Sequence, residues 1–236
     1  MTLQEWSRRV AALGQFRVAD PAAPILSRDD EHHLRRVLRA NAGEEIVVTN
    51  GAGDWSFAAV TDAGLERVSD VVVDPTPEPI TLYLAPVKGE RGEWAIAKAT
   101  ELGVTRVVPL LCARLAVAFK GDFATKTLAR WRRIANESAG QCRRTSDLLI
   151  DQPIRVADVP EDVAVADFGG TASWAPVRAV AIGPEGGWAA GEWNDERTRV
   201  GLGSTVLRAE TAAVAAATLM AAARDGWART SMTENR

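Results

Sequence analysis

The sequence contains very little cysteine, histidine and tyrosine: two cysteines, two histidines and one tyrosine among 236 residues. Cys112 and Cys142 form no CxxC pair, so we expect two reduced thiols and no disulfide. The only histidines, His32 and His33, are adjacent, and this spacing does not suit a zinc site. We therefore expect no bound metal. A Ser–His–Asp arrangement is also disfavoured, because both histidines lie in the first part of the chain.

Long apolar runs are absent as well. The longest, residues 212–223, is rich in alanine and too short to cross a membrane. The first residues show no basic segment followed by an apolar run, so we expect no signal peptide and a cytoplasmic protein. The apolar fraction of 47% and the charged fraction of 25% are ordinary for globular proteins and argue against a disordered chain.

The net charge of −3 argues by itself against a nucleic-acid ligand, but the charge is unevenly distributed. Residues 1–74 hold eight Lys and Arg against twelve Asp and Glu, whereas residues 114–144 hold eight against two. Such a run often marks only a solvated helix face, yet so strong an imbalance also fits contacts with RNA phosphates. A second, smaller basic face is expected at Arg35, Arg36 and Arg39.

The proline-rich segment 75–79 divides the chain, since proline continues neither a helix nor a central strand. We predict one domain over residues 1–74, a linker over residues 75–79 and a second domain over residues 80–236. The first domain has the pattern of a small β-barrel, because strand-like runs at 46–49 and 55–60 flank a glycine-rich hairpin turn.

Two helices are expected in the first domain. Ser27 is a typical N-cap residue for one of them. The other is expected near the N-terminus, where Leu3, Trp6, Val10 and Leu13 follow helical spacing and should be packed.

The second domain alternates strand-like and helix-like segments, which predicts an α/β domain with a mostly parallel sheet. The expected strands are residues 81–86, 106–111, 163–168 and 178–182. The expected helices are residues 91–102, 124–140, 192–199 and 209–224.

Two segments could carry chemistry. Residues 182–187, Ile-Gly-Pro-Glu-Gly-Gly, follow a buried strand and expose backbone amides with little side-chain bulk. A ligand loop and a plain strand-to-helix turn both fit these residues. Residues 201–212 lead into the long alanine-rich helix, with Arg208 and Glu210 at its start. Glu210 fits a helix N-terminus and could merely cap it, together with Thr211, whereas a cation there suits an anionic ligand.

Taken together, these segments resemble the RsmE-type 16S ribosomal RNA uracil-N3 methyltransferases, which belong to the SPOUT class of knotted methyltransferases. The resemblance is carried by residues 182–187, 202–203 and 207–212, and in addition by residues 98–104 and 33–39.

The resemblance implies a PUA-like β-barrel for RNA binding, followed by an α/β domain with a C-terminal trefoil knot. It also implies S-adenosylmethionine as cofactor, S-adenosylhomocysteine as product, and a homodimer. The expected partner is the 16S rRNA of the 30S ribosomal subunit, and the expected activity is methylation of uridine N3. Two alternatives stay open: an enzyme of this class acting on ribose 2′-OH or another RNA, and a non-catalytic RNA-binding or ribosome-assembly factor.

The resemblance also nominates site residues. Arg208, Glu210 and Arg144 are the catalytic candidates; Arg208 would stabilise a uracil anion or grip a phosphate, and Glu210 would position it or act as a base. The expected cofactor-binding residues are Asp167, Phe168, Ile182, Gly183, Pro184, Glu185, Gly186, Gly187, Leu202, Gly203, Leu207, Ala209 and Thr211. The expected RNA contacts are Arg35, Arg36, Arg39, Lys88, Arg91, Arg114, Lys126, Arg130, Arg133, Gln141, Arg143 and Arg144.

The sequence departs from the family pattern in two places. Residues 140–144 read Gly-Gln-Cys-Arg-Arg, where the family usually has Glu-Gln-Ser/Cys-Gly-Arg. Gly140 therefore supplies no acidic group, and Arg143 stands in place of a glycine. In addition, about a dozen residues precede the segment Phe16-Arg17-Val18, which resembles the family's first strand.

Overall fold

The computed structural model describes residues 2–87, 89–116 and 118–227. The chain forms two compact units. The first comprises Met1–Pro77 and Asn136–Asp147, and the second comprises Glu78–Ala135 and Leu148–Arg236. Residues 136–147 thus belong to the first unit although they follow the proline-rich segment, which the sequence did not indicate.

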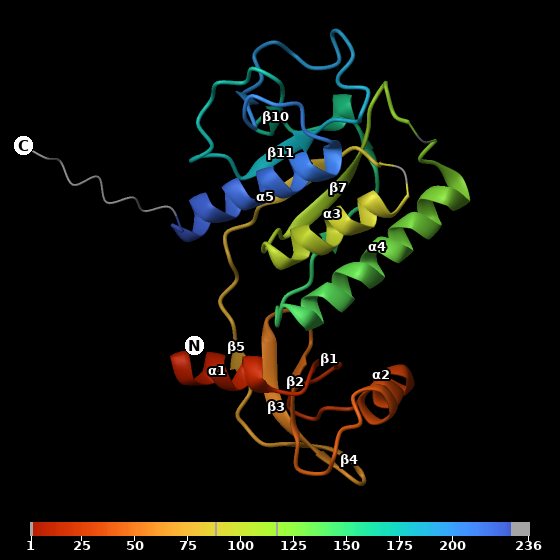
Figure 1. Cartoon of the computed structure of the whole chain (residues 1–236), viewed down its shortest axis with the longest axis vertical. Helices are drawn as coiled ribbons and strands as arrows, with labels where there is room; N and C mark the ends of the chain where they lie inside the picture. Colours follow the sequence, from red (N-terminus) through yellow and green to blue (C-terminus); the bar gives the residue numbers. More distant parts are fainter. Residues whose placement is uncertain (1, 88, 117, 228–236) are drawn as a thin grey trace, which may run out of the picture. The chain divides into compact units, whose positions relative to one another are not determined.

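The first unit is built around one five-stranded sheet (Figure 1). Its strands are β1 (Gln15–Arg17), β2 (Glu45–Thr49), β3 (Asp54–Thr61), β4 (Gly64–Arg67) and β5 (Val72–Val73). The order is β1-β2-β3-β4, and β5 pairs with β3; β1 and β2 are parallel, and the other pairs are antiparallel. The predicted hairpin is confirmed as the β2–β3 pair.

The helix after Ser27 begins as predicted. The Ser27 hydroxyl accepts a hydrogen bond from the Asp30 N–H at 3.1 Å, so Ser27 is the N-cap of α2 (Arg28–His32). This helix continues as a π-helical turn, η1 (His33–Val37), whose Leu34 is buried in the core of the unit.

The N-terminal helix α1 (Leu3–Ala11) forms, but the expectation that its apolar residues are packed is wrong for three of them. Leu3, Trp6 and Val10 are exposed, whereas Arg9 is only 4% exposed. Arg9 forms an ion pair with Asp74 and lies over the Trp55 ring, with its guanidinium carbon 5.0 Å from the ring centroid. The charged and aromatic partners of Arg9, which lie far along the chain, decide which face of α1 is buried.

The second unit contains a seven-stranded sheet in which every pairing is parallel, as predicted. Its strands are β6 (Thr81–Leu84), β7 (Arg106–Leu111), β8 (Leu149–Ile150), β9 (Ile154–Arg155), β10 (Ala164–Ala166), β11 (Ala179–Ile182) and β12 (Arg199–Val200). The order is β12-β10-β11-β6-β7-β8, with β9 paired to β7. Parallel strands buried on both faces are apolar along their whole length, and β10 and β11 show that pattern.

Both faces of this sheet are covered. The helical elements of the unit are α3 (Glu90–Glu101), most of α4 (Gly121–Gln141), η2 (Val156–Asp158) and α5 (Ala209–Asp225). Figure 1 shows α3 and α5 side by side along one face, where Leu82 and Leu84 meet Met220 in one core cluster. Tyr83 and Ala85 point to the other face, because side chains alternate along a strand.

The expectation of a helix over residues 192–199 is wrong. The segment forms turns and ends in β12. The Asn194 side chain accepts a hydrogen bond from the Glu196 N–H at 3.0 Å, and such local bonds compete with helix formation. Trp193 is buried against Trp188, with 5.1 Å between the ring centroids, so packing stabilises the turn.

Two loops of the second unit approach each other closely at glycines. A Cβ atom added to Gly201 would lie 2.5 Å from the carbonyl oxygen of Gly170, and one added to Gly170 would lie 2.5 Å from the carbonyl carbon of Val200. Only glycine fits both positions, because the obstructing atoms are backbone atoms. The trefoil knot implied by the resemblance stays a prediction.

We expect Gly201→Ala to lower the free energy of unfolding by at least ~2 kcal/mol, because the new methyl group overpacks a backbone crossing. Urea unfolding followed by tryptophan fluorescence measures the loss. Gly203→Ala is the matched control, since its Cβ would meet no atom within 4 Å and would add only the strain of φ +106°. Equal loss in both variants would contradict the steric explanation.

Candidate active site

A cavity of about 220 Å³ lies at the carboxyl ends of β10 and β11 and beside the start of α5. In parallel α/β sheets, ligands bind at this end of the strands. The cavity is lined by Ala166, Asp167, Phe168, Ile182, Gly183, Pro184, Glu185, Gly187, Trp188, Leu202, Gly203, Thr205, Val206, Leu207, Ala209 and Ala212. The structure thus brings three segments that are distant in the sequence to one place.

All the residues predicted to bind the cofactor line this cavity except Gly186 and Thr211. Their role stays a prediction, although their convergence is observed. Five further residues line the cavity without having been predicted to bind the cofactor: Ala166, Trp188, Thr205, Val206 and Ala212. Trp188 had a visible signal, because a large aromatic residue directly follows the two glycines of the loop.

Trp188 fixes the conformation of the glycine loop. Its indole N–H donates a hydrogen bond to the Ala166 carbonyl at 3.0 Å, which ties the loop to the end of β10. A Cβ atom at Gly183 would lie 3.0 Å from the Trp188 ring. Glycine at 183 therefore allows the indole to lie against the loop backbone.

Arg114 supports the same loop from another segment. Its guanidinium donates a hydrogen bond to the Gly186 carbonyl at 3.2 Å, and a Cβ atom at Gly186 would lie 3.2 Å from the Arg114 Cβ atom. Gly186 thus contacts Arg114 instead of lining the cavity.

The ionisable residues that line the cavity are acidic. Asp167 and Glu185 are on its wall, and no Lys or Arg is among the lining residues. The Asp167 carboxylate is held in place, since it pairs with Arg199 at 2.5 Å and accepts the Phe168 N–H at 2.9 Å. Both lining carboxylates are paired with an arginine that lies outside the lining, Asp167 with Arg199 and Glu185 with Arg91.

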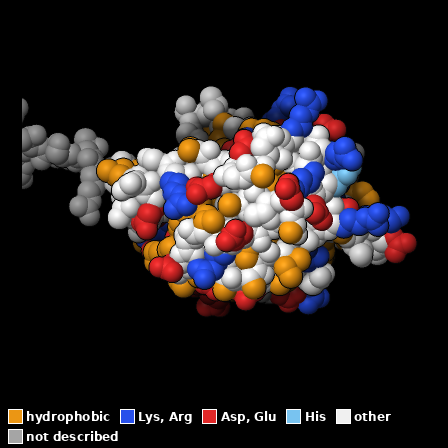
Figure 2. Space-filling model, turned by 90° about the horizontal axis from the view of Figure 1, so that it is seen from below, with side chains coloured by type: hydrophobic (Ala, Val, Ile, Leu, Met, Phe, Trp, Pro, Cys, Tyr) orange, Lys and Arg blue, Asp and Glu red, His pale blue; other side chains and the backbone are white. Residues whose placement is uncertain are grey.

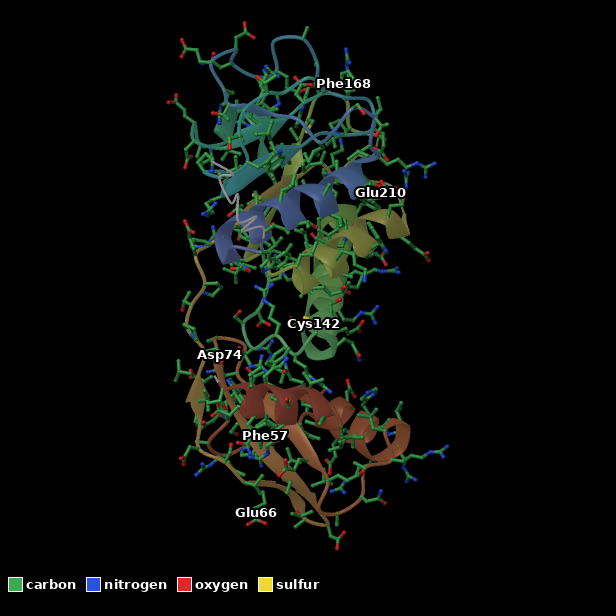
Figure 3. All side chains as sticks on the ribbon, turned by 60° about the vertical axis from the view of Figure 1, so that its left-hand side comes forward. Phe57, Glu66, Asp74, Cys142, Phe168 and Glu210 are labelled. Carbon is green, nitrogen blue, oxygen red and sulfur yellow. The ribbon has the colours of Figure 1, made fainter. Side chains whose placement is uncertain are left out.

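Arg91 joins Glu185, which lines the cavity, to Glu210, which is not among the lining residues. Its guanidinium lies 3.2 Å from the Glu185 carboxylate and 3.8 Å from that of Glu210. Glu210 is 8% exposed and lies in the first turn of α5 (Figure 3). Its Oε2 atom has no hydrogen-bond partner among the described residues. Arg91, predicted to contact RNA, is thus observed to link the glycine loop to α5.

Arg208 is the N-cap residue of α5 and is exposed. Within the described part of the chain, its side chain makes no hydrogen bond or ion pair, and nothing joins it to Glu210. The cation is therefore available to an anion from outside the protein, at the helix end that attracts anions.

The third catalytic candidate, Arg144, belongs to the first unit, whereas Arg208 and Glu210 belong to the second. The turn before Arg144 is tightly held. The Gln15 amide donates to the Arg144 carbonyl at 2.5 Å, and the Arg143 guanidinium donates to the Ala12 carbonyl at 2.7 Å. Arg143 has φ +61°, a conformation that favours glycine.

The predicted RNA-contact residues differ in exposure. Those exposed are Arg36, Arg39, Arg114, Lys126, Arg130, Arg133 and Gln141, and those half-buried are Arg35, Arg91, Arg143 and Arg144. Lys88 lies outside the described residues. Figure 2 shows one face of the molecule, on which several basic side chains lie near histidine while basic, acidic and apolar side chains are mixed over the rest. The basic face around η1 is thus small.

The described residues give little support to a reactive thiol, a metal site or a membrane-spanning helix. Burial raises the pKa of the Cys112 thiol to about 12, and the charge of Glu192 contributes, so this thiol is protonated at neutral pH. In the part of the chain that the structure describes, no three His, Cys, Asp or Glu residues are grouped to hold a metal ion. No helix there is both long and apolar enough to span a membrane.

Comparison with known proteins assigns the chain to a family. Residues 74–221 match the model of an RNA methyltransferase domain, and residues 26–69 match that of an RNA methyltransferase PUA domain. The ribosomal RNA small subunit methyltransferase E of Mycobacterium tuberculosis is 31% identical over 226 residues, covering 83% of this chain and 84% of that protein. The chain belongs to this RNA methyltransferase family. The Bacillus subtilis protein of the same name is 29% identical over 217 residues, covering 79% and 85%.

Solved structures agree with membership of the RNA methyltransferase family. A Legionella pneumophila protein described as a methyltransferase, in complex with S-adenosylmethionine, has a TM-score of 0.76 and 28% identity, covering 89% of this chain and 97% of that one. The ribosomal RNA small subunit methyltransferase E of Neisseria gonorrhoeae, bound to S-adenosylmethionine, has a TM-score of 0.69 and 26% identity, covering 88% and 96%. The first unit of this family member accordingly contains the PUA-like domain.

In this RNA methyltransferase, we expect Arg91→Ala to lower kcat/KM about tenfold, which corresponds to ~1.4 kcal/mol. Glu185 and Glu210 would lose their shared cation, and the loop and helix would no longer be linked. Single-turnover methylation assays measure the effect, and Arg91→Lys should retain part of the rate. Arg155→Ala, which breaks the exposed pair with Asp158 at 2.9 Å, is the control. Unchanged rates in Arg91→Ala would refute the link.

Proposed function

We propose that this RNA methyltransferase transfers a methyl group from S-adenosylmethionine to N3 of a uridine in the 16S rRNA of the small ribosomal subunit. The observation that carries the proposal is the convergence of the three predicted cofactor segments on one cavity. The names of the relatives support ribosomal RNA as the substrate, and two solved relatives contain S-adenosylmethionine. Specificity for uracil N3 follows from the resemblance.

The residues around the cavity fit this cofactor. Leu202 and Leu207 offer apolar surface for an adenine ring, and the glycines leave backbone groups accessible. The carboxylates of Asp167 and Glu185 suit a positively charged sulfonium, and the lining contains no basic side chain that would repel it.

The chain's own residues would prepare the uracil. When bound, the cofactor supplies a methyl group on positively charged sulfur, suited to in-line displacement. Neutral uracil N3 carries a proton and is a weak nucleophile, so its proton must be removed. We assign proton removal to Glu210, whose Oε2 has no hydrogen bond among the described residues, and stabilisation of the uracil anion to the exposed Arg208.

The proposal includes the remaining expectations. Residues 1–74 act in RNA binding and residues 80–236 in catalysis, with Arg144 contributing from the turn at the end of α4. Basic side chains of η1 and α4 contact RNA phosphates. The resemblance supports a homodimer, a knotted C-terminal segment and a cytoplasmic location.

Nucleoside mass spectrometry of small-subunit RNA, from cells with and without this gene, tests the function. Loss of 3-methyluridine, restored by the purified protein with S-adenosylmethionine, is the expected result. Loss of a ribose methylation alone would refute the assignment to N3. Calorimetry with S-adenosylmethionine tests the cofactor separately: absence of binding would favour a non-catalytic RNA-binding factor.

A further inference from the structure

We propose that Phe168 is the surface on which the target nucleobase stacks during the reaction, with Val206 as a second apolar contact. This inference rests on the proposed function and assigns to Phe168 a role toward the RNA instead of the cofactor. Phe168, labelled in Figure 3, follows β10. Val206 lies on the segment before α5, so two different segments would hold the base.

The exposure of these two side chains is the first observation. Both line the cavity, yet Phe168 is 71% exposed and Val206 is 89% exposed. By contrast, the lining residue Ile182 is 1% exposed. A large apolar side chain left in water forgoes about 1.5–3 kcal/mol of burial free energy. At the rim of a ligand cavity, this surface is available to a bound molecule.

The second observation is that the backbone of Phe168 is anchored although its ring is exposed. The Asp167 side chain accepts the Phe168 N–H at 2.9 Å and pairs with Arg199 at 2.5 Å. The Asp167 N–H donates to the Val200 carbonyl at 3.0 Å. Because the Phe168 backbone is already fixed, stacking a base on its ring costs the protein little conformational entropy.

The chemistry of the reaction selects a nucleobase as the occupant. N3 lies on the edge of uracil that pairs with another base, so the target must leave its pair or stack before N3 becomes accessible. Stacking uses the face of the ring and leaves that edge free for displacement in the ring plane. The exposed Arg114 supplies a cation for an adjoining phosphate.

Steady-state methylation kinetics and calorimetry test the proposal. Phe168→Ala should reduce kcat/KM for RNA roughly tenfold to a hundredfold, the range expected for one base–aromatic stack. Its Kd for S-adenosylmethionine should stay within about twofold of the wild type, because the ring contacts the base. Phe168→Tyr should restore most of the rate, and Val206→Ala should show a smaller loss of kcat/KM.

Phe123→Ala is the matched control, since Phe123 is an exposed phenylalanine on α4 outside the site. An RNA lacking the target base gives a second test. The wild type should bind this RNA more weakly than it binds intact RNA, whereas Phe168→Ala should bind the two RNAs equally well. Unchanged kcat/KM in Phe168→Ala, an equal loss of cofactor affinity, or a change of oligomeric state would overturn the proposal. Failure of the proposed function itself would instead appear in the wild type, as absence of methylation.

Discussion

Arg208→Ala is expected to lower kcat for methyl transfer by about a hundredfold or more, with the Kd for S-adenosylmethionine within about twofold of the wild type. The side chain is exposed and makes no hydrogen bond or ion pair with the described residues, so its removal should not disturb the fold. What is lost is the positive charge beside the developing uracil anion. Single-turnover assays with saturating RNA and cofactor separate this effect from binding.

Two further variants make the result specific. Arg208→Lys keeps the charge and should retain part of the rate, although it loses the planar guanidinium. Glu210→Gln removes the assigned proton acceptor and should lower the rate most at low pH, where less uracil is ionised in solution. Near-normal turnover of both Arg208→Ala and Glu210→Gln would remove these residues from the mechanism.

Asp74→Ala is expected to lower the free energy of unfolding by about 3 kcal/mol, the usual effect of breaking a buried ion pair. Asp74 accepts hydrogen bonds from Arg9 at 3.0 Å, from the Trp55 indole at 3.0 Å and from the Thr145 hydroxyl at 2.7 Å. Arg9 is 4% exposed, so the variant would leave a buried guanidinium without its carboxylate. Urea unfolding measures the loss.

The control for this prediction is an exposed ion pair from the same helix. Arg8 pairs with Glu45 at 2.7 Å, and both side chains are more than a third exposed. Glu45→Ala should therefore cost less than about 1 kcal/mol. If Asp74→Ala and Glu45→Ala cost the same, the buried network does not stabilise the first unit.

The same carboxylate predicts how stability depends on pH. Burial by itself would raise the pKa of Asp74, but hydrogen bonds from Thr145, Trp55 and Arg9 together hold this pKa below its ordinary value. Because the folded-state pKa is lowered, the ionised Asp74 carboxylate stabilises the fold fully above the unfolded-state pKa, about 4. This stabilisation is lost as the pH falls through the folded-state pKa. Unfolding midpoints measured from pH 7 to pH 3 should therefore fall less steeply in Asp74→Asn than in the wild type.

Local sequence patterns predicted much of the second unit, and the failures share a cause. The parallel sheet, the helix with its start at Ala209 and the glycine loop follow from apolar runs, glycine positions and strand–helix alternation. The helix expected over residues 192–199 does not form, because Asn194 closes a turn and Trp193 packs on Trp188. Apolar spacing cannot show such side-chain competition.

The N-terminal helix shows that apolar spacing also fails to predict which residue of a helix is buried. Its helical spacing was correctly interpreted, yet the buried residue is Arg9. The partner of Arg9 in the ion pair is Asp74, and its guanidinium also donates to the Arg143 carbonyl. A contact with residues so distant along the chain leaves no trace in a periodic pattern.

The sequence by itself determined the class of the fold and the segments that carry the site, because strand periodicity, glycine position and helix ends are local properties of the chain. Only the tertiary structure decided which charged side chains of those segments pair with one another. Arg91, Glu185 and Glu210 come from three separate segments, and their distances of 3.2 Å and 3.8 Å exist only once β11, α3 and α5 have packed. The exposed ring of Phe168 beside this cavity was decided in the same way, since burial depends on neighbours that folding brings together.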